Sequence, residues 1–271
     1  MNQKEKAQVF RELHHRAEIL VLPNAWDAAS ARVFELAGAP AVATTSSGLA
    51  ASLGYPDGEI IPRALVISAV QQICRTVEIP VSVDAEAGYG NSAEEVGETV
   101  KTLLDAGAVG VNLEDGMLDP RLLVAKIAAA REISAAKDVP LFVNARTDVY
   151  LQARVPGAAG FAEAVRRLRA YENAGADGLF APGLADPAEI SRLLREIRLP
   201  LNIMAFAGVP TAKELERLGV KRVSVGAGPM RATLGLVRRI AEEVLREGTY
   251  SSFLDAPSHG EVNGMFRASR P

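Results

Sequence analysis

Short apolar runs recur along the chain, and each has the length and composition of a β-strand that is buried on both faces. They are rich in valine, leucine, isoleucine and alanine, and they follow one another at intervals of roughly thirty residues. The expected strands cover residues 19–22, 41–45, 80–84, 109–114, 140–146, 178–181, 200–204 and 222–226.

The segments between these runs show the apolar spacing of amphipathic helices. The expected helices cover residues 4–16, ahead of the first strand, and then 93–106, 120–136, 160–174, 187–197, 211–218 and 229–247. A glycine, the residue that commonly ends a helix in the left-handed conformation, precedes every second strand, at Gly38, Gly107, Gly175 and Gly219. A proline, which suits the first position of a strand, opens the strands in between, at Pro80, Pro140 and Pro200.

Eight strand–helix units of this size match a single-domain TIM-type (β/α)8 barrel, which has about 250 residues. We therefore predict one barrel domain over residues 1–271, with an N-terminal helix ahead of the first strand. An open, doubly wound α/β sheet is the alternative that the same alternation of elements allows.

The last segment, residues 249–271, lies beyond the eighth helix and has no position to fill in the barrel. It nevertheless carries several apolar residues, namely Phe253, Leu254, Val262, Met265 and Phe266. One interpretation is a lid on the same subunit. We favour an arm that packs on a partner subunit.

The composition suits a globular protein with a large core, since 48% of the residues are hydrophobic and 23% are charged. A net charge of −3 gives no reason to expect a nucleic acid or an anionic membrane surface as partner. The chain has no apolar run long enough to span a membrane and no secretory leader, and its one cysteine fits a reducing cytoplasm. Neither His14 nor His15 is near a strand end, and we expect both to be exposed to solvent on the first helix.

Acidic and polar residues gather at the carboxyl ends of the strands, where barrel enzymes have their active sites. The third strand ends in Asp84 and Glu86, and the fourth ends in Glu114 and Asp115. Carboxylates that converge in this way suit Mg²⁺, with Mn²⁺ as a second possibility, and few direct protein ligands are needed because Mg²⁺ keeps several waters. We expect Asp84 to bind the metal directly, and Glu86, Glu114 and Asp57 to act through water. The alternative is that these acids form structural ion pairs.

Other strand ends offer groups that could bind an anionic substrate. Asn144, Arg146 and Asp148 alternate on the fifth strand, so one face would present all three. The guanidinium of Arg146 is a natural bidentate partner for a carboxylate. After the second strand, Ser46-Ser47-Gly48-Leu49 could bind a carboxylate or enolate oxygen through a hydroxyl and backbone N–H groups, although an ordinary turn would have the same composition.

Taken together, these motifs resemble the isocitrate lyase/phosphoenolpyruvate mutase superfamily. The resemblance runs in order over about residues 20–230, and each motif is moderately specific by itself. The motifs are Thr-Thr-Ser-Ser-Gly-Leu at 44–49, Gly-Tyr-Pro-Asp at 54–57, Asp-Ala-Glu-Ala-Gly-Tyr-Gly-Asn at 84–91, Leu-Glu-Asp at 113–115, Asn-Ala-Arg-Thr-Asp at 144–148, and Asn202.

The resemblance implies a Mg²⁺-dependent enzyme that makes or breaks a bond next to the carbonyl of an α-keto acid. It implies that Asp84, Glu86 and Glu114 form the metal site, with Asp57 beside it, and that Asp57 and Arg146 take part in catalysis. The substrate contacts that it implies are Thr45, Ser47, Gly48, Leu49, Asp84, Arg146 and Asn202. Members are commonly tetrameric with an exchanged terminal helix, so a dimer or tetramer is expected.

Departures from the family pattern narrow the expected reaction. The lyases carry a cysteine- and histidine-containing loop after the fourth strand, whereas this chain has the short segment 114–121 with neither residue. They also have a glutamate after the sixth strand, where this chain has Phe180-Ala181-Pro182-Gly183. Decarboxylation or cleavage of an oxaloacetate-like keto or hydroxy diacid is therefore the leading hypothesis. Phosphonopyruvate-type P–C bond chemistry and a non-catalytic keto-acid-binding barrel are the alternatives.

Overall fold

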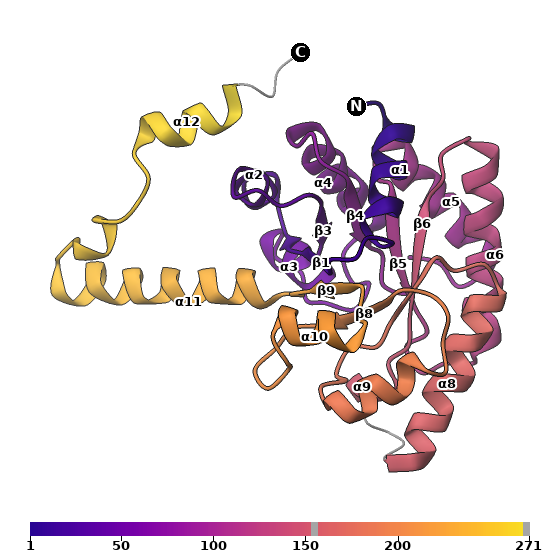
Figure 1. Ribbon diagram of the computed structural model, residues 1–271. Helices are drawn as coiled ribbons and strands as arrows, with labels where there is room; N and C mark the ends of the chain where they lie inside the picture. The colour runs from indigo at the N-terminus through magenta and orange to yellow at the C-terminus, as the bar shows by residue number, and fades with distance from the viewer. Residues whose placement is uncertain (153–156, 268–271) are drawn as a thin grey trace.

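The computed structural model describes residues 1–152 and 157–267. Its strands form a nearly closed parallel barrel surrounded by helices, which confirms the expected TIM-type fold (Figure 1). The sheet order is β1-β9-β8-β7-β6-β5-β4-β3-β2. The strands are β1 (Leu20–Leu22), β2 (Asn24–Ala25), β3 (Val42–Thr44), β4 (Val81–Asp84), β5 (Gly110–Glu114), β6 (Phe142–Arg146), β7 (Gly178–Phe180), β8 (Leu201–Met204) and β9 (Arg222–Ser224).

The described strands number nine, not the expected eight, because the first strand is divided at Pro23. Proline has no N–H to donate to a ladder, so the pairing changes partner there. β1 pairs with β9, whereas β2 pairs with β3. The Asn24 side chain helps to close the barrel at this point: its Nδ2 donates to the Thr44 carbonyl at 2.7 Å, and its Oδ1 accepts from the Val225 and Gly226 N–H groups at 2.9 Å.

The helices follow the strands in the expected order, and their bounds agree closely with the apolar spacing. Those of the barrel are α1 (Gln3–Leu13), α2 (Ala28–Leu36), α3 (Ser46–Ser52), α4 (Arg63–Thr76), α5 (Ala93–Asp105), α6 (Pro120–Ala136), α7 (Val149–Gln152), α8 (Gly157–Asn173), α9 (Pro187–Leu194), α10 (Ala212–Leu218) and α11 (Gly228–Glu242). All four glycines at the helix ends have φ near +100°, as expected for left-handed stops: Gly38, Gly107, Gly175 and Gly219. None of the described helices is long and apolar enough to cross a membrane.

The main apolar core lies between the strands and the surrounding helices. Outward-facing residues of β4, β5 and β6, such as Val83, Val111 and Val143, pack against apolar residues of α5, α6 and α8. Successive side chains of a strand alternate between faces, so the residues between these valines point into the barrel. The inner face of the barrel is polar over much of its length, and the candidate functional groups lie on this face.

Helix α1 covers the amino-terminal end of the barrel (Figure 1). The Phe10 ring packs edge-on against Phe142 of β6 with ring centroids 5.5 Å apart, and Gln3 Nε2 donates to the Leu104 and Ala108 carbonyls. The expectation that both neighbouring histidines are exposed is wrong for His14, which is 1% exposed, and holds for His15. His14 stacks on Phe142 at 3.9 Å because it lies on the same face of α1 as Phe10.

Burial, helped by the positive charge of Arg222, lowers the pKa of His14 to about 3. The unfolded chain would bind a proton on His14 below about pH 6.5, whereas the folded protein would not until about pH 3. The free energy of unfolding should therefore fall as the pH decreases through this interval. We expect the free energy of unfolding of the wild-type protein to depend on pH more steeply than that of His14→Leu, by about 1.4 kcal/mol per pH unit. The reason is that unfolding of the wild-type protein takes up one additional proton, on His14.

Urea unfolding of both proteins between pH 7 and pH 4.5 measures this difference. His15→Leu is the matched control, since it removes a neighbouring exposed histidine. Parallel stability curves for the wild-type protein and His14→Leu would show that His14 is not held neutral by the fold.

The C-terminal arm begins with α11, which extends away from the barrel (Figure 1). It continues through a π-helical turn (Glu243–Glu247) and a 3-10 turn (Ser251–Phe253) to α12 (His259–Arg267). The Glu243 carboxylate accepts hydrogen bonds from the backbone and hydroxyl groups of Ser251 and Ser252, which fixes the bend after α11. Arg32 Nε of α2 donates to the Met265 carbonyl at 2.7 Å, so α12 contacts its own barrel.

Candidate functional site

Polar side chains line the inside of the barrel, and those of neighbouring strands lie opposite one another. Asp84 of β4 pairs with Asn112 of β5, which pairs with Asn144 of β6. The Asn144 Nδ2 donates to Asn112 Oδ1 at 2.9 Å. One step further along the strands, Glu114 pairs with Arg146. The expected strand-end residues of β4, β5 and β6 therefore lie together above a polar layer.

Asp84 is held at the carboxyl end of β4 by hydrogen bonds on both sides. Its N–H donates to Thr44 Oγ1 at 2.9 Å, and its Oδ2 accepts from the Ser46 N–H at 3.1 Å. Its other oxygen, Oδ1, is buried and has no hydrogen-bond partner among the described residues. A buried carboxylate oxygen in this state is a good candidate for a cation ligand.

Glu86 is buried two residues further on, in a turn where it adopts φ +49°. Both of its oxygens are occupied: Oε1 accepts from the Tyr89 hydroxyl at 2.8 Å and Oε2 from the Glu59 N–H at 3.0 Å. Burial, together with the charges of Asp57, Asp84 and Glu59, raises the pKa of Glu86 to about 7, although the Tyr89 hydrogen bond opposes this. These contacts suit a carboxylate that acts on a metal through water.

Arg146 lies between two carboxylates at the end of β6. Its Nη1 is 2.7 Å from Glu114 Oε2, and its Nε donates to Asp148 Oδ1 at 2.6 Å. Burial disfavours the guanidinium charge, but Glu114, Asp148 and Asp84 together raise the pKa of Arg146 above its ordinary value. Burial raises the pKa of Glu114, and the Arg146 charge opposes that shift. We take Arg146 to be protonated, because three carboxylates surround it.

Asp115 is a structural residue, in contrast to its neighbour Glu114. Its Oδ2 accepts from Arg167 Nη1 at 3.1 Å and from the Tyr171 hydroxyl at 2.7 Å, while its Oδ1 accepts from two backbone N–H groups. Arg167 Nη1 also donates to the Leu118 carbonyl at 2.8 Å. The short segment after β5 is therefore fastened to α8.

The segment after β3 forms a short helix, α3, where we considered an ordinary turn. Thr45 is its N-cap residue, and Gly48 and Leu49 are buried on the side that faces the barrel. The first N–H groups of a helix have no acceptor within it, so those of Ser47 and Gly48 are available near Asp84. A Cβ on Gly48 would lie 2.6 Å from Thr45 Cγ2 and 2.9 Å from Trp26 Cβ, so the close packing of α3 requires glycine.

Asn202 and Arg222 lie deeper in the barrel, on the paired strands β8 and β9. Asn202 Oδ1 accepts from Ser224 Oγ at 3.3 Å, and Asn202 Nδ2 has no partner among the described residues. Arg222 is 0% exposed, and its Nη2 reaches across the barrel to Asn112 Oδ1 at 3.3 Å. Sequence reasoning missed Arg222, although its alternation with Ser224 on β9 repeats the pattern of Asn144 and Arg146 on β6.

Asp57 lies in the exposed loop between α3 and α4. It is close enough to the site for its charge to contribute to the raised pKa of Glu86. Of the expected site residues, Asp57 is therefore at the solvent side, whereas Thr45, Gly48, Leu49, Glu86 and Asn202 are buried.

The residues fit a Mg²⁺ site that has few direct protein ligands. In residues 1–152 and 157–267, no three His, Cys, Asp or Glu side chains converge into a preformed metal site. Mg²⁺ usually takes one or two carboxylates and completes its octahedron with water and substrate oxygens. The unpartnered Oδ1 of Asp84 can serve as the direct ligand, and the engaged carboxylates of Glu86 and Glu114 can hold the waters.

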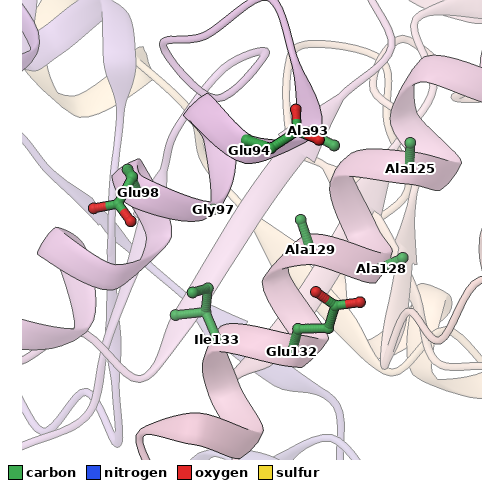
Figure 2. A pocket seen from close by; sticks show the side chains of 9 residues that line it. All are labelled: Ala93, Glu94, Gly97, Glu98, Ala125, Ala128, Ala129, Glu132 and Ile133. Atoms are coloured by element: carbon green, nitrogen blue, oxygen red, sulfur yellow. The ribbon is translucent and has the colours of Figure 1, made fainter.

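A separate hollow of about 410 Å³ lies outside the barrel, between α5 and α6 (Figure 2). Small residues such as Gly97 and Ala129 line its floor, and Glu94, Glu98 and Glu132 line its rim. None of its lining residues belongs to a strand end, so it is distinct from the candidate site.

A parallel barrel with carboxylates, an arginine and helix N–H groups at the carboxyl ends of its strands has the features of a TIM-barrel enzyme. The sequence profile of the family described as phosphoenolpyruvate phosphomutase matches residues 10–245. The chain belongs to this family, and hence to the isocitrate lyase/phosphoenolpyruvate mutase superfamily that its motifs resemble.

Three relatives illustrate the range of activities in the superfamily. The structure of a candidate phosphonomutase from Burkholderia cenocepacia is 43% identical, with a TM-score of 0.85 over 88% of this chain and 99% of that one. The 2-methylisocitrate lyase of Aeropyrum pernix is 31% identical over 91% of this chain and 82% of its own length. A phosphonopyruvate hydrolase solved with oxalate and Mg²⁺ is 28% identical, with a TM-score of 0.84 over 98% and 95% of the two chains.

The close approach of α3 to Trp26 gives a prediction for Gly48→Ala. The added methyl group must displace Thr45 or Trp26, so we expect a loss of about 1–3 kcal/mol of stability. Trp26 is the sole tryptophan, and its fluorescence should change with the displacement. Gly228→Ala is the matched control because a Cβ there meets no atom within 4 Å. Equal stability and identical emission spectra for the two variants would contradict the packing constraint.

Proposed function

We propose that the protein is a Mg²⁺-dependent lyase or decarboxylase that acts on a short α-keto or hydroxy dicarboxylate resembling oxaloacetate. The observation that carries the proposal is the meeting of two opposite features at one end of the barrel. Asp84, Glu86 and Glu114 provide negative charge for a divalent cation, and Arg146 and the start of α3 provide donors for an anionic substrate.

Arg146 is the proposed partner of the substrate carboxylate. Its Nε and Nη1 are engaged by Asp148 and Glu114, whereas its Nη2 has no hydrogen bond to any residue that the structure describes. The two acids fix the plane of the guanidinium, so Nη2 is oriented before a substrate arrives. The Phe180 ring lies 5.8 Å from the guanidinium carbon and limits its movement on one side.

The α3 N–H groups are proposed to bind the oxygen that gains negative charge as the bond breaks. Oriented donors of this kind contribute roughly 3–4 kcal/mol each to transition-state stabilisation. A Mg²⁺ ion held by Asp84 would polarise the substrate's keto and carboxylate oxygens. Ser46 N–H keeps Asp84 turned toward this region, and Asn202 Nδ2 supplies a further donor from below.

The positions of the histidines and of the cysteine favour a reaction that needs little proton transfer. His14 lies at the opposite end of the barrel, His15 is exposed near it, and His259 is in the C-terminal arm. Cys74 is in α4, and burial raises its pKa to about 12, which suppresses the thiolate. Loss of CO₂ from an oxaloacetate-like acid leaves an enolate without requiring an acid at the moment of cleavage.

Phosphonopyruvate-type P–C chemistry is the second candidate, with Asp57 near the transferred group. The similarity to a candidate phosphonomutase favours it.

A non-catalytic keto-acid-binding barrel is the third candidate function, since the short segment after β5 brings no cysteine or histidine to the site.

The metal assignment is tested by Asp84→Asn. We expect calorimetric titration with Mg²⁺ to show at least a tenfold weaker affinity, because the direct ligand loses its charge. Asp186→Asn, at the exposed N-cap of α9, is the matched control, since asparagine caps a helix as well as aspartate does. Unchanged Mg²⁺ affinity in Asp84→Asn would refute the assignment.

A substrate panel then separates the three candidates. Oxaloacetate, dimethylmalate, methylisocitrate and phosphonopyruvate are incubated with Mg²⁺ in the presence and absence of the protein, and both pyruvate and phosphoenolpyruvate are measured. Turnover of oxaloacetate or dimethylmalate supports the lead proposal, and turnover of phosphonopyruvate alone supports the second. Saturable binding of a keto diacid without any turnover supports the third.

We propose further that the C-terminal arm packs on a partner subunit through the side chains that its own barrel leaves uncovered, while α12 keeps its contact with Arg32. The apolar side chains of the arm are mostly uncovered within one chain: Leu245 is 83% exposed and Leu254 is 85% exposed. Exposed apolar surface on this scale is typical of an interface between subunits.

We expect the full chain to sediment as a dimer or tetramer, and the double variant Leu245→Lys, Leu254→Lys to sediment as a smaller species. Two charges placed in an apolar interface would oppose association. Leu118→Lys, at a position that is exposed outside the arm, is the control. Identical sedimentation of the full chain and the double variant would contradict an exchanged arm.

A further inference from the structure

Glu59 and Tyr89 connect the loop that carries Asp57 to the end of β4. The Glu59 N–H donates to Glu86 Oε2 at 3.0 Å, and the Tyr89 hydroxyl donates to Glu86 Oε1 at 2.8 Å. In return, Glu59 Oε1 accepts from the Tyr89 N–H at 2.7 Å. The three residues therefore form a closed set of hydrogen bonds, which we call the Glu59–Tyr89–Glu86 clamp.

One side of the clamp is rigid. A Cβ on Gly88 would lie 2.7 Å from the Val96 methyl groups, and one on Gly90 would lie 2.6 Å from Glu95 Cβ, so this turn packs directly on α5. Lys126 Nζ of α6 donates to the Ala87 carbonyl at 2.7 Å and holds the turn from the other side. Glu86 and Tyr89 are thus presented from a fixed support.

The other side of the clamp is a loop with few contacts. Residues 56–58, Asp57 among them, are exposed, whereas Glu59 is half-buried and Ile61 is buried. Beside the clamp lies a hollow of about 560 Å³ lined by residues 59–63 of this loop and by Tyr89, Gly90, Asn91 and Glu95. The loop therefore has space into which it can move when the clamp opens.

The backbone of the clamp is strained. Glu59, Glu86 and Tyr89 adopt φ values of 58°, 49° and 53°, in the left-handed region that non-glycine residues rarely occupy. Such conformations persist only where surrounding contacts offset their cost, and they cluster at functional sites. Here the offsetting contacts are the hydrogen bonds of the clamp itself.

We propose that Glu59 is a positioning residue that docks the Asp57 loop onto Glu86 and so couples the position of Asp57 to occupancy of the metal site. The coupling rests on the proposed function, because it requires that Glu86 holds the metal's water shell. Glu86, when it holds the water shell of a metal, would be fixed in place, so that it would accept more strongly from the Glu59 N–H and hold Asp57 toward the substrate. When Glu86 does not hold the metal's water, the loop would be free to open into the adjacent hollow.

Hydrogen exchange of the full-length protein, followed by mass spectrometry, tests the docking without an activity assay. Saturating Mg²⁺ should slow exchange in residues 54–60 of the wild-type protein by at least about threefold. Glu59→Ala removes the acceptor for the Tyr89 N–H, so exchange in this loop should become about tenfold faster and no longer respond to Mg²⁺. Glu59→Gln keeps a carbonyl acceptor and should restore most of the protection.

Glu98→Ala, an exposed glutamate of α5, is the matched control and should leave the loop unchanged. The peptides of β5 and β6 report whether a variant is globally destabilised. If Glu59→Ala is, Glu59→Asp replaces it, because a side chain one methylene shorter withdraws the acceptor from the Tyr89 N–H. In one outcome, calorimetry shows that Mg²⁺ binds through Asp84 while hydrogen exchange in residues 54–60 of the wild-type protein does not respond to Mg²⁺. That result would overturn the coupling and leave the proposed function intact. Absence of Mg²⁺ binding to the wild-type protein would overturn both.

Discussion

The main constraint on this molecule is the repulsion among carboxylates that the barrel brings to one end. Asp84, Glu86, Glu114 and Asp148 come from three consecutive strand ends, where their negative charges repel one another. Burial and the neighbouring negative charges raise the pKa of Glu86 to about 7 and the pKa of Glu114 above its ordinary value. Arg146 offsets part of the charge by lying between Glu114 and Asp148. In the proposed function, a divalent cation beside the unpartnered Oδ1 of Asp84 would offset the rest.

The barrel supports this site because its two faces carry different chemistry. The outward faces of the strands and the helices form the apolar core that stabilises the fold. At the amino-terminal end, apolar residues gather on the inner face, where α1 places Phe10 and the uncharged His14 against Phe142. Above that layer, Asn112, Asn144 and the buried Arg222 form the polar floor of the site. The candidate site and the contacts of α1 therefore lie at opposite ends of the barrel interior, and changes at the α1 end are expected to affect folding more than chemistry.

The elements and the strand-end acids could be predicted from the sequence because both follow from local patterns. Apolar runs locate the strands, and Asp84, Glu114 and Arg146 follow from where those runs end. Arg222 could not be placed in the same way, since an arginine at the start of a three-residue strand points inward or outward according to register, which is set by pairing with β8 and β1. The burial of His14 depends on which face of α1 meets the barrel. Glu59 lies in a loop with no periodicity, so its contact with Glu86 arises from tertiary structure alone.

Family membership defines the common machinery, and the two loops around it decide what the machinery can do. The segment after β5 is fastened by Asp115 to Arg167 and Tyr171, and Arg167 also holds the Leu118 carbonyl. This segment brings neither a cysteine nor a histidine to the site. The loop that carries Asp57 is held mainly through Glu59, next to open space. Under the proposed function, selection among short keto acids would fall to this loop, because it borders the site beside a hollow of about 560 Å³.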